Sequence, residues 1–376
     1  MLGPAGIGLL GILNAIMSTA CTVIGLGLSN SGVRQVAEAF AERDYYKLSS
    51  TKRGLFSATI ALGILGGALT VFLQEFISKL ATGNEVFSRD IAWLGIGIFA
   101  ATISASLAAW LNGLRRLGDL TRINVIGSIA AMAFGIVAVW LWGMKGIAVA
   151  VIAVPLSSLS ASWYYAARTK IPTAASGVSI WSCYESMKRL FVLGLAFCAT
   201  SLMTVGTQFV IRVIVTRELG IDATGHFQAA WNISVLYLGF VLGAMGTDYY
   251  PRLTAVACDT AASNEMMNEQ AEVALLLSGP VILAMLTLTP WLIALFYSEA
   301  FVETTAVLRW QILGDIFKVT SWSLAFLFLA QARTVVFFLT ELAGNLVYIG
   351  CVWFGLAVWG LEATGIGFLI CYFFYF

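Results

Sequence analysis

Charged residues are scarce in this chain. Asp, Glu, Lys and Arg make up 11% of the 376 residues, whereas a soluble domain carries about 25%. A fold of this length with so little charge cannot cover its surface with polar side chains. The composition therefore excludes a soluble enzyme.

Histidine and cysteine are scarce as well, and the net charge is small. The chain has one His and six Cys, and no two cysteines have the C-x-x-C spacing of metal and redox sites. We therefore expect no metal, no cofactor and no catalytic residue. The 21 Lys and Arg nearly balance the 20 Asp and Glu, so the charge does not indicate nucleic-acid binding.

Long apolar runs are abundant. Hydrophobic residues make up 60% of the chain and the mean hydropathy is +0.89. About 20 apolar residues in a helix cross a bilayer core, and a helix satisfies its own backbone hydrogen bonds there. The sequence predicts an all-α polytopic membrane protein. Its predicted spans are 7–29, 54–77, 91–111, 123–142, 147–165, 190–216, 227–246, 273–297, 307–330, 334–354 and a last one from Leu361 onward.

Basic residues gather in alternate loops. Fourteen of the 21 Lys and Arg lie in the segments 30–53, 112–122, 166–189, 247–272 and 331–333. Cytoplasmic loops carry such an excess, so these segments are predicted to be cytoplasmic. The first visible helix then runs inward from the outside, which leads us to expect another helix before Met1.

The chain has the organisation of two halves. The longest central linker, 166–189, separates an N-terminal bundle at 1–165 from a C-terminal bundle at 190–376. A weak repeat supports a duplication, because Asn14–Arg34 and Asn232–Arg252 have the same twenty-residue spacing. We expect two six-helix bundles related by a pseudo-two-fold axis along the membrane normal, with the first helix missing, the last one truncated and binding between the halves.

One stretch is specific enough to indicate a family. Residues 310–319 read W-Q-I-L-G-D-I-F-K-V, which resembles the W-Q-x-x-G-D-x-x-K-V stretch of the Wzx-type polysaccharide flippases of the MOP (MATE-like) superfamily. Four further features fall at matching places and extend the resemblance over essentially the whole chain. They are Leu2–Gly8, Arg212, Tyr250–Leu253 and Glu341.

The resemblance implies a function. Flippases of this kind move an undecaprenyl-diphosphate-linked oligosaccharide, such as an O-antigen unit or the lipid III of enterobacterial common antigen, from the cytoplasmic to the periplasmic leaflet. We expect alternating access, ion coupling and a location in the bacterial inner membrane. The expected partners are the lipid-linked substrate and membrane lipids, with a polymerase and a chain-length regulator of the same pathway as further candidates.

Few polar residues lie within the apolar runs, and they are the candidates for the mechanism. Asp315 and Glu341 are candidates for ion coupling. The candidates for substrate binding are Asn14, Arg34, Arg212, Asn232, Arg252 and Lys318.

Each candidate also has a structural interpretation. Asp315 and Lys318 share a helix face and can form a neutralising pair, and Glu341 can be a partner for Lys318. Arg212 can snorkel to the interface. Arg34 and Arg252 can set topology, and amides can join helices.

Two other functions remain open at this point. A MATE-like multidrug or ion antiporter shares the superfamily, although its pocket would hold isolated acids rather than charges of both signs. A membrane polysaccharide polymerase or ligase would need a sizeable outer loop with catalytic residues, whereas the predicted outer loops are short.

Overall fold

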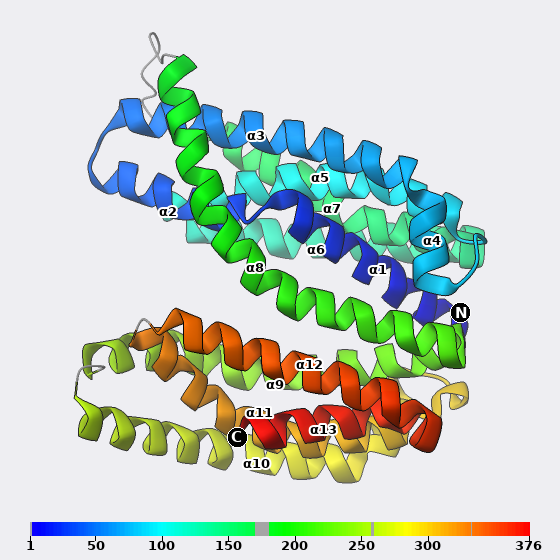
Figure 1. Cartoon of the computed structure of the whole chain (residues 1–376). Helices are drawn as coiled ribbons and strands as arrows, with labels where there is room; N and C mark the ends of the chain where they lie inside the picture. The colour runs from blue at the N-terminus through cyan, green and yellow to red at the C-terminus, as the bar shows by residue number, and fades with distance from the viewer. Residues whose placement is uncertain (1, 170–179, 257–258, 332) are drawn as a thin grey trace. The chain divides into compact units, whose positions relative to one another are not determined.

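The computed structural model (Figure 1) describes residues 2–169, 180–256, 259–331 and 333–376, and every regular element in these ranges is a helix. The predicted all-α class is confirmed. The α-helices are α1 (Pro4–Gly25), α2 (Leu28–Ala41), α3 (Tyr45–Phe72), α4 (Gln74–Thr82), α5 (Ser88–Gly113), α6 (Leu117–Trp142), α7 (Gly146–Ala167), α8 (Ile180–Leu219), α9 (Ile221–Val256), α10 (Thr260–Phe296), α11 (Thr304–Ala330), α12 (Thr334–Trp359) and α13 (Ala363–Tyr375). Short 3₁₀ helices lie at η1 (Gly143–Lys145), η2 (Glu299–Phe301) and η3 (Gly360–Glu362).

Seven stretches of the described chain are long and apolar enough to cross a membrane. Two of them, Leu117–Ala167 and Val335–Tyr375, each contain two helices joined by a 3₁₀ turn. Large apolar side chains also face outward, with Phe72 84% exposed and Trp140 69% exposed, as expected of helices in contact with lipid. The protein is a multi-pass membrane protein.

Helices α9 and α11 contain the predicted spans 227–246 and 307–330. Helix α11 is unbroken, but Arg309, Asp315 and Lys318 interrupt its apolar sequence. This span therefore carries two of the functional candidates, Asp315 and Lys318.

The chain forms two compact units. Unit 1 comprises Leu2 and Ile12–Phe209, and unit 2 comprises Gly3–Gly11 and Val210–Phe376. The predicted bundles at 1–165 and 190–376, the pseudo-two-fold axis and the linker 166–189 remain predictions. Residues 170–179 of that linker lie outside the described residues.

In unit 1, α5 packs against α2, α3 and α7, and α6 packs against α7. Small residues allow α3 and α5 to approach closely. A Cβ added to Gly67 would lie 2.8 Å from the carbonyl oxygen of Gly95, and a Cβ on Gly95 would lie 2.8 Å from that of Gly67. Such close backbone contacts are typical of helix pairs in membranes.

The predicted continuous helix over 7–29 is wrong. Helix α1 ends at Gly25 and α2 begins at Leu28, because the backbone at Leu26 and Gly27 is left-handed, with φ of 45° and 65°. Glycine adopts this region without strain. It also gives room, since a Cβ on Gly27 would lie 2.1 Å from the carbonyl oxygen of Gly194 in α8.

In unit 2, α11 packs against α9, α10 and α13, and α12 packs against α13. The turn from α12 to α13 has a counterpart in unit 1, between α6 and α7. In both turns a tryptophan precedes a glycine of positive φ, 55° at Gly143 and 54° at Gly360, and a 3₁₀ helix follows. The two units thus repeat one local connection.

Candidate functional site

Asp315 lies on α11 and is fully buried in unit 2. Its Oδ2 accepts a hydrogen bond of 2.9 Å from Ser234 Oγ and a second one from the Tyr237 hydroxyl. Both donors lie on α9, three residues apart, so they share a helix face. A buried carboxylate is thereby held by hydroxyl donors of the neighbouring helix.

The other side of this carboxyl group has no partner in the described chain. Asp315 Oδ1 and both polar atoms of the Gln311 side chain are buried without a hydrogen bond. Gln311 lies one helical turn before Asp315. Buried polar atoms are normally paired. Asp315 Oδ1 can bind a proton or a cation, Gln311 Oε1 can accept a hydrogen bond or bind a cation, and Gln311 Nε2 can donate to a polar ligand. Clusters of three or more His, Cys, Asp or Glu side chains that could hold a metal ion are absent from the described residues.

Lys318 has its own surroundings. Its Nζ lies 5.3 Å from the ring centroid of Phe368, 5.4 Å from that of Tyr372 and 5.8 Å from that of Trp231. A cation over aromatic faces is stabilised by the ring quadrupoles. Asp315 is therefore held by hydroxyl donors and Lys318 by aromatic faces, although the two residues share a face of α11.

Glu341 lies on α12, and its side chain has a described hydrogen bond to α13 rather than to Lys318. Its Oε1 accepts a 2.7 Å hydrogen bond from the Tyr375 hydroxyl. Tyr375 also lines a mostly apolar cavity of about 420 Å³ formed by residues of α11, α12 and α13. The Glu341 carboxylate is therefore hydrogen-bonded to a residue that lines this cavity of unit 2.

Arg212 and Asn232 are brought together through a third residue. Arg212 is only 6% exposed, and its Nε donates a 2.8 Å hydrogen bond to Gln228 Oε1. Gln228 Nε2 in turn donates a 2.7 Å hydrogen bond to Asn232 Oδ1. The guanidinium also lies 5.5 Å from the ring centroid of Phe227. The burial of Arg212 inside unit 2 contradicts the snorkelling interpretation.

The remaining candidates are Asn14, Arg34 and Arg252. Asn14 is half-buried on α1 and Arg34 is exposed on α2, both in unit 1. Arg252 is exposed near the end of α9.

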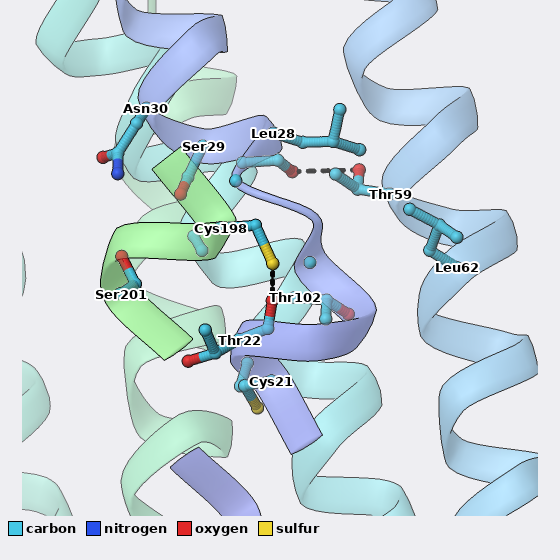
Figure 2. A pocket seen from close by; sticks show the side chains of 15 residues that line it. Cys21, Thr22, Leu28, Ser29, Asn30, Thr59, Leu62, Thr102, Cys198 and Ser201 are labelled. Atoms are coloured by element: carbon cyan, nitrogen blue, oxygen red, sulfur yellow. Dashed lines mark hydrogen bonds between the residues drawn. The ribbon is translucent and has the colours of Figure 1, made fainter. Parts of the chain in front are cut away.

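Unit 1 contains a pocket at the break between α1 and α2 (Figure 2), with a volume of about 230 Å³. Cys198 of α8 donates a 3.3 Å hydrogen bond to the Thr22 carbonyl at this break. The polar lining carries no formal charge and consists of Thr22, Ser29, Asn30, Thr59, Thr102, Ser106 and Ser201 together with the two thiols, Cys21 and Cys198. Hydroxyl and amide groups of this kind both donate and accept hydrogen bonds, so the pocket can bind uncharged polar groups such as sugar hydroxyls.

Sequence reasoning missed several residues of these sites. Those in unit 2 are Gln228, Ser234, Tyr237, Gln311 and Tyr375. A usable signal existed for two of them, because Gln228 precedes Asn232 and Gln311 precedes Asp315 by one helical turn. The sequence did not indicate the pocket of unit 1. This pocket depends on the break between α1 and α2, and the apolar sequence continues through that break.

Comparison with known proteins agrees with the fold. The family described as "Polysaccharide biosynthesis protein" matches residues 1–256. The lipid III flippases of Escherichia coli (strain K12) and Shigella flexneri are each 20% identical to this chain over 353 residues, which are 91% of this chain and 81% of theirs.

Two solved structures illustrate the likeness in fold. An inward-facing multidrug resistance MATE family transporter of the MOP superfamily superposes with a TM-score of 0.85 at 15% identity, covering 100% of this chain and 88% of its own. A MOP superfamily transporter from Pyrococcus furiosus superposes with a TM-score of 0.67 at 16% identity, covering 99% of this chain and 91% of its own. The chain therefore has the MOP transporter fold.

Proposed function

This chain belongs to the polysaccharide biosynthesis protein family, as its resemblance to the Wzx-type flippases predicted, and from that membership we propose that it is a flippase. Its substrate is an undecaprenyl-diphosphate-linked oligosaccharide, an O-antigen unit or a lipid of the lipid III type. It moves this lipid from the cytoplasmic to the periplasmic leaflet of the bacterial inner membrane by alternating access.

The similarity to two lipid III flippases over 91% of the chain is the observation that carries this proposal. The transporter fold supports transport rather than enzymatic catalysis. A polymerase or a chain-length regulator of the same pathway would be a functional partner.

The chemistry of unit 2 suits such a substrate. A diphosphate is costly to bring to bilayer depth, and buried cations offset that cost. Arg212 offers a planar fork that binds two phosphate oxygens at once, and Lys318 offers a second positive charge. Asn232 and the hydroxyl-lined pocket of unit 1 supply hydrogen bonds for sugar groups. Arg34 and Arg252, both exposed, are proposed to attract the diphosphate at the cytoplasmic face, and Asn14 is proposed to line the passage.

Asp315 and Glu341 are the proposed coupling acids. A bound ion drives transport only if it interacts differently with the two conformations. Asp315 meets this requirement if the ion occupies its free Oδ1 and Gln311 in one state only. Proton and Na⁺ coupling both fit this arrangement.

The test is leaflet transfer in liposomes. The purified protein is reconstituted with a fluorescent lipid-linked oligosaccharide, and the fraction accessible to an external quencher is followed with and without an ion gradient. We expect transfer well above that of protein-free liposomes, and a reduction of about tenfold in Arg212→Gln and Lys318→Gln, since hydrogen bonds to charged groups contribute about 1.5–3 kcal/mol.

Lys145→Gln is the matched control, because Lys145 is exposed on η1 and should leave the rate unchanged. Transfer no faster than in protein-free liposomes would refute the proposal. Expulsion of a cationic dye from the same liposomes, without lipid transfer, would support multidrug antiport instead.

A further inference from the structure

A second pocket in unit 1 lies away from the sites described above. It has a volume of about 460 Å³ and is lined by residues of α2, α3 and α8. This end of unit 1 carries the basic segments that the positive-inside pattern assigns to the cytoplasm. The lining residues are Gln35, Glu38, Lys47, Thr51, Lys188, Arg189, Val192 and Leu193.

The charged residues of the lining are mostly cationic. Lys47, Lys188 and Arg189 carry three positive charges, and Glu38 is the acid among the lining residues. Lys47 Nζ donates hydrogen bonds of 2.8 Å to Glu38 and 3.0 Å to Glu42. The Lys47 ammonium holds the pKa of Glu38 below its usual range. The acid is therefore ionised, and Lys47 is shared between Glu38 and Glu42, so Lys188 and Arg189 on α8 supply the further positive charge of the lining.

Gln35 points independently to a ligand. This side chain is 8% exposed and lines the pocket, and its Nε2 has no hydrogen-bond acceptor in the part of the chain that the structure describes. A buried amide donor without an acceptor is destabilising. An anionic oxygen in the pocket would satisfy this donor and be balanced by Lys188 and Arg189.

The apolar part of the lining indicates what else the ligand carries. Val192 and Leu193 follow the basic pair by one turn of α8, on the way to the apolar stretch Phe197–Leu219. Val192 is 65% exposed. A ligand with a charged head at Lys188 and Arg189 would therefore have its chain beside an apolar surface that leads toward the membrane.

We propose that this pocket binds the diphosphate of the polyprenyl-linked substrate at the cytoplasmic face before translocation, with Lys188 and Arg189 on the phosphate oxygens, Gln35 as a further donor and Val192 against the prenyl chain. The identity of the lipid rests on the proposed function. The phosphate site itself does not, because it follows from the charges and from the Gln35 donor.

Binding of inorganic pyrophosphate to the full-length protein in neutral detergent at low ionic strength tests the site without transport. We expect Lys188→Gln/Arg189→Gln to weaken binding about tenfold or more, since charge-assisted hydrogen bonds to phosphate are the strong ones. Gln35→Glu, which replaces the donor by an acid of the same shape, should also weaken it. Lys145→Gln/Arg309→Gln removes two exposed cations elsewhere and should not. Unaltered affinity in the first double variant, or equal loss in the control, would overturn the site.

A competition experiment then identifies the source of the phosphate. Farnesyl diphosphate should displace pyrophosphate at lower concentration than phosphatidylglycerol in mixed micelles, and Val192→Asp should abolish that advantage. Equal displacement by phosphatidylglycerol would overturn the substrate assignment. If the protein moved no lipid in liposomes yet bound pyrophosphate through Lys188 and Arg189, the proposed function would fail while the phosphate site would stand.

Discussion

At the scale of single residues, the described contacts of Asp315 are to α9. Its described donors are the hydroxyls of Ser234 and Tyr237, and its Oδ1 is left without a partner. Hydroxyl donors stabilise a carboxylate without cancelling its charge, so the group can still bind and release an ion.

Asp315→Asn should therefore abolish ion coupling and leave folding intact. The amide has the same shape and can keep the contacts to Ser234 and Tyr237, but it cannot bind a cation or a proton in the same way. We expect the acceleration of leaflet transfer by an ion gradient to disappear, a loss of about fivefold or more, which is typical of coupled sites.

The readout is the ratio of transfer rates with and without the gradient, together with the apparent midpoint of thermal unfolding. Glu75→Gln, at an exposed position of α4, should leave both unchanged. An intact gradient response in Asp315→Asn would assign the coupling role elsewhere, with Glu341 as the next candidate.

The sequence identified such residues better than it identified their partners. Asp315, Lys318 and Arg212 stand out because ionisable side chains are rare within apolar helices. Tyr237, however, lies 78 residues from Asp315, and an aromatic residue in an apolar helix carries no sign of the hydrogen bond it makes. Partners of this kind follow from helix packing, which a single sequence does not reveal.

At the scale of helices, the break between α1 and α2 is the main departure from the sequence prediction. Apolar residues continue through Leu26–Leu28, so hydropathy alone predicts one span. The left-handed backbone at Leu26 and Gly27 stops the helix, and the carbonyl of Gly194 in α8 occupies the space where a side chain at residue 27 would lie.

Gly27→Ala should destabilise the protein more than the same substitution at a glycine of positive φ that has open space around it. The alanine would meet both the left-handed conformation, which costs about 1–2 kcal/mol, and the Gly194 carbonyl. Gly83→Ala is the matched control, because Gly83 has a φ of 77° but nothing within 4 Å of an added Cβ. The measurement is the midpoint of thermal unfolding in detergent. Equal shifts for the two variants would show that the contact with Gly194 contributes nothing.

The halves are alike in some elements and different in others. The tryptophan–glycine turns lie at Gly143 and Gly360. Their separation in sequence agrees within one residue with that of Asn14 and Asn232, which the weak repeat pairs. In contrast, α9 runs unbroken from Ile221 to Val256, whereas unit 1 breaks its first helix at Leu26–Gly27. Helix α9 therefore has no break at which a pocket like that of unit 1 could form.

At the scale of the whole molecule, composition predicted the class and basic loops predicted the orientation. The described chain confirms an all-helical, multi-pass protein with seven apolar stretches. The orientation still rests on the distribution of Lys and Arg. Basic loops set the topology during membrane insertion. The two ends of a single membrane-spanning helix lie on opposite sides of the membrane, so locating the ends of one helix tests the predicted orientation.

Helix α6 offers a matched pair of positions for that test. Leu117 at its start and Met144 just beyond its end are 63% and 45% exposed. In intact cells, a membrane-impermeant maleimide should label Met144→Cys and leave Leu117→Cys unlabelled, each in a background without the natural cysteines. Permeabilised cells should show labelling of both, and the reverse pattern in intact cells would invert the predicted orientation.

The separate surroundings of Asp315 and Lys318 have a consequence for how this protein can change over time. The two charges attract each other, but each also has partners of its own, hydroxyl groups at Asp315 and aromatic rings at Lys318. Under the proposed roles, with the coupling ion at Asp315 and the anionic head group at Lys318, a substitution at one position leaves the partners of the other in place. Ion coupling and head-group binding can then change separately during evolution, although one helical turn separates the two residues.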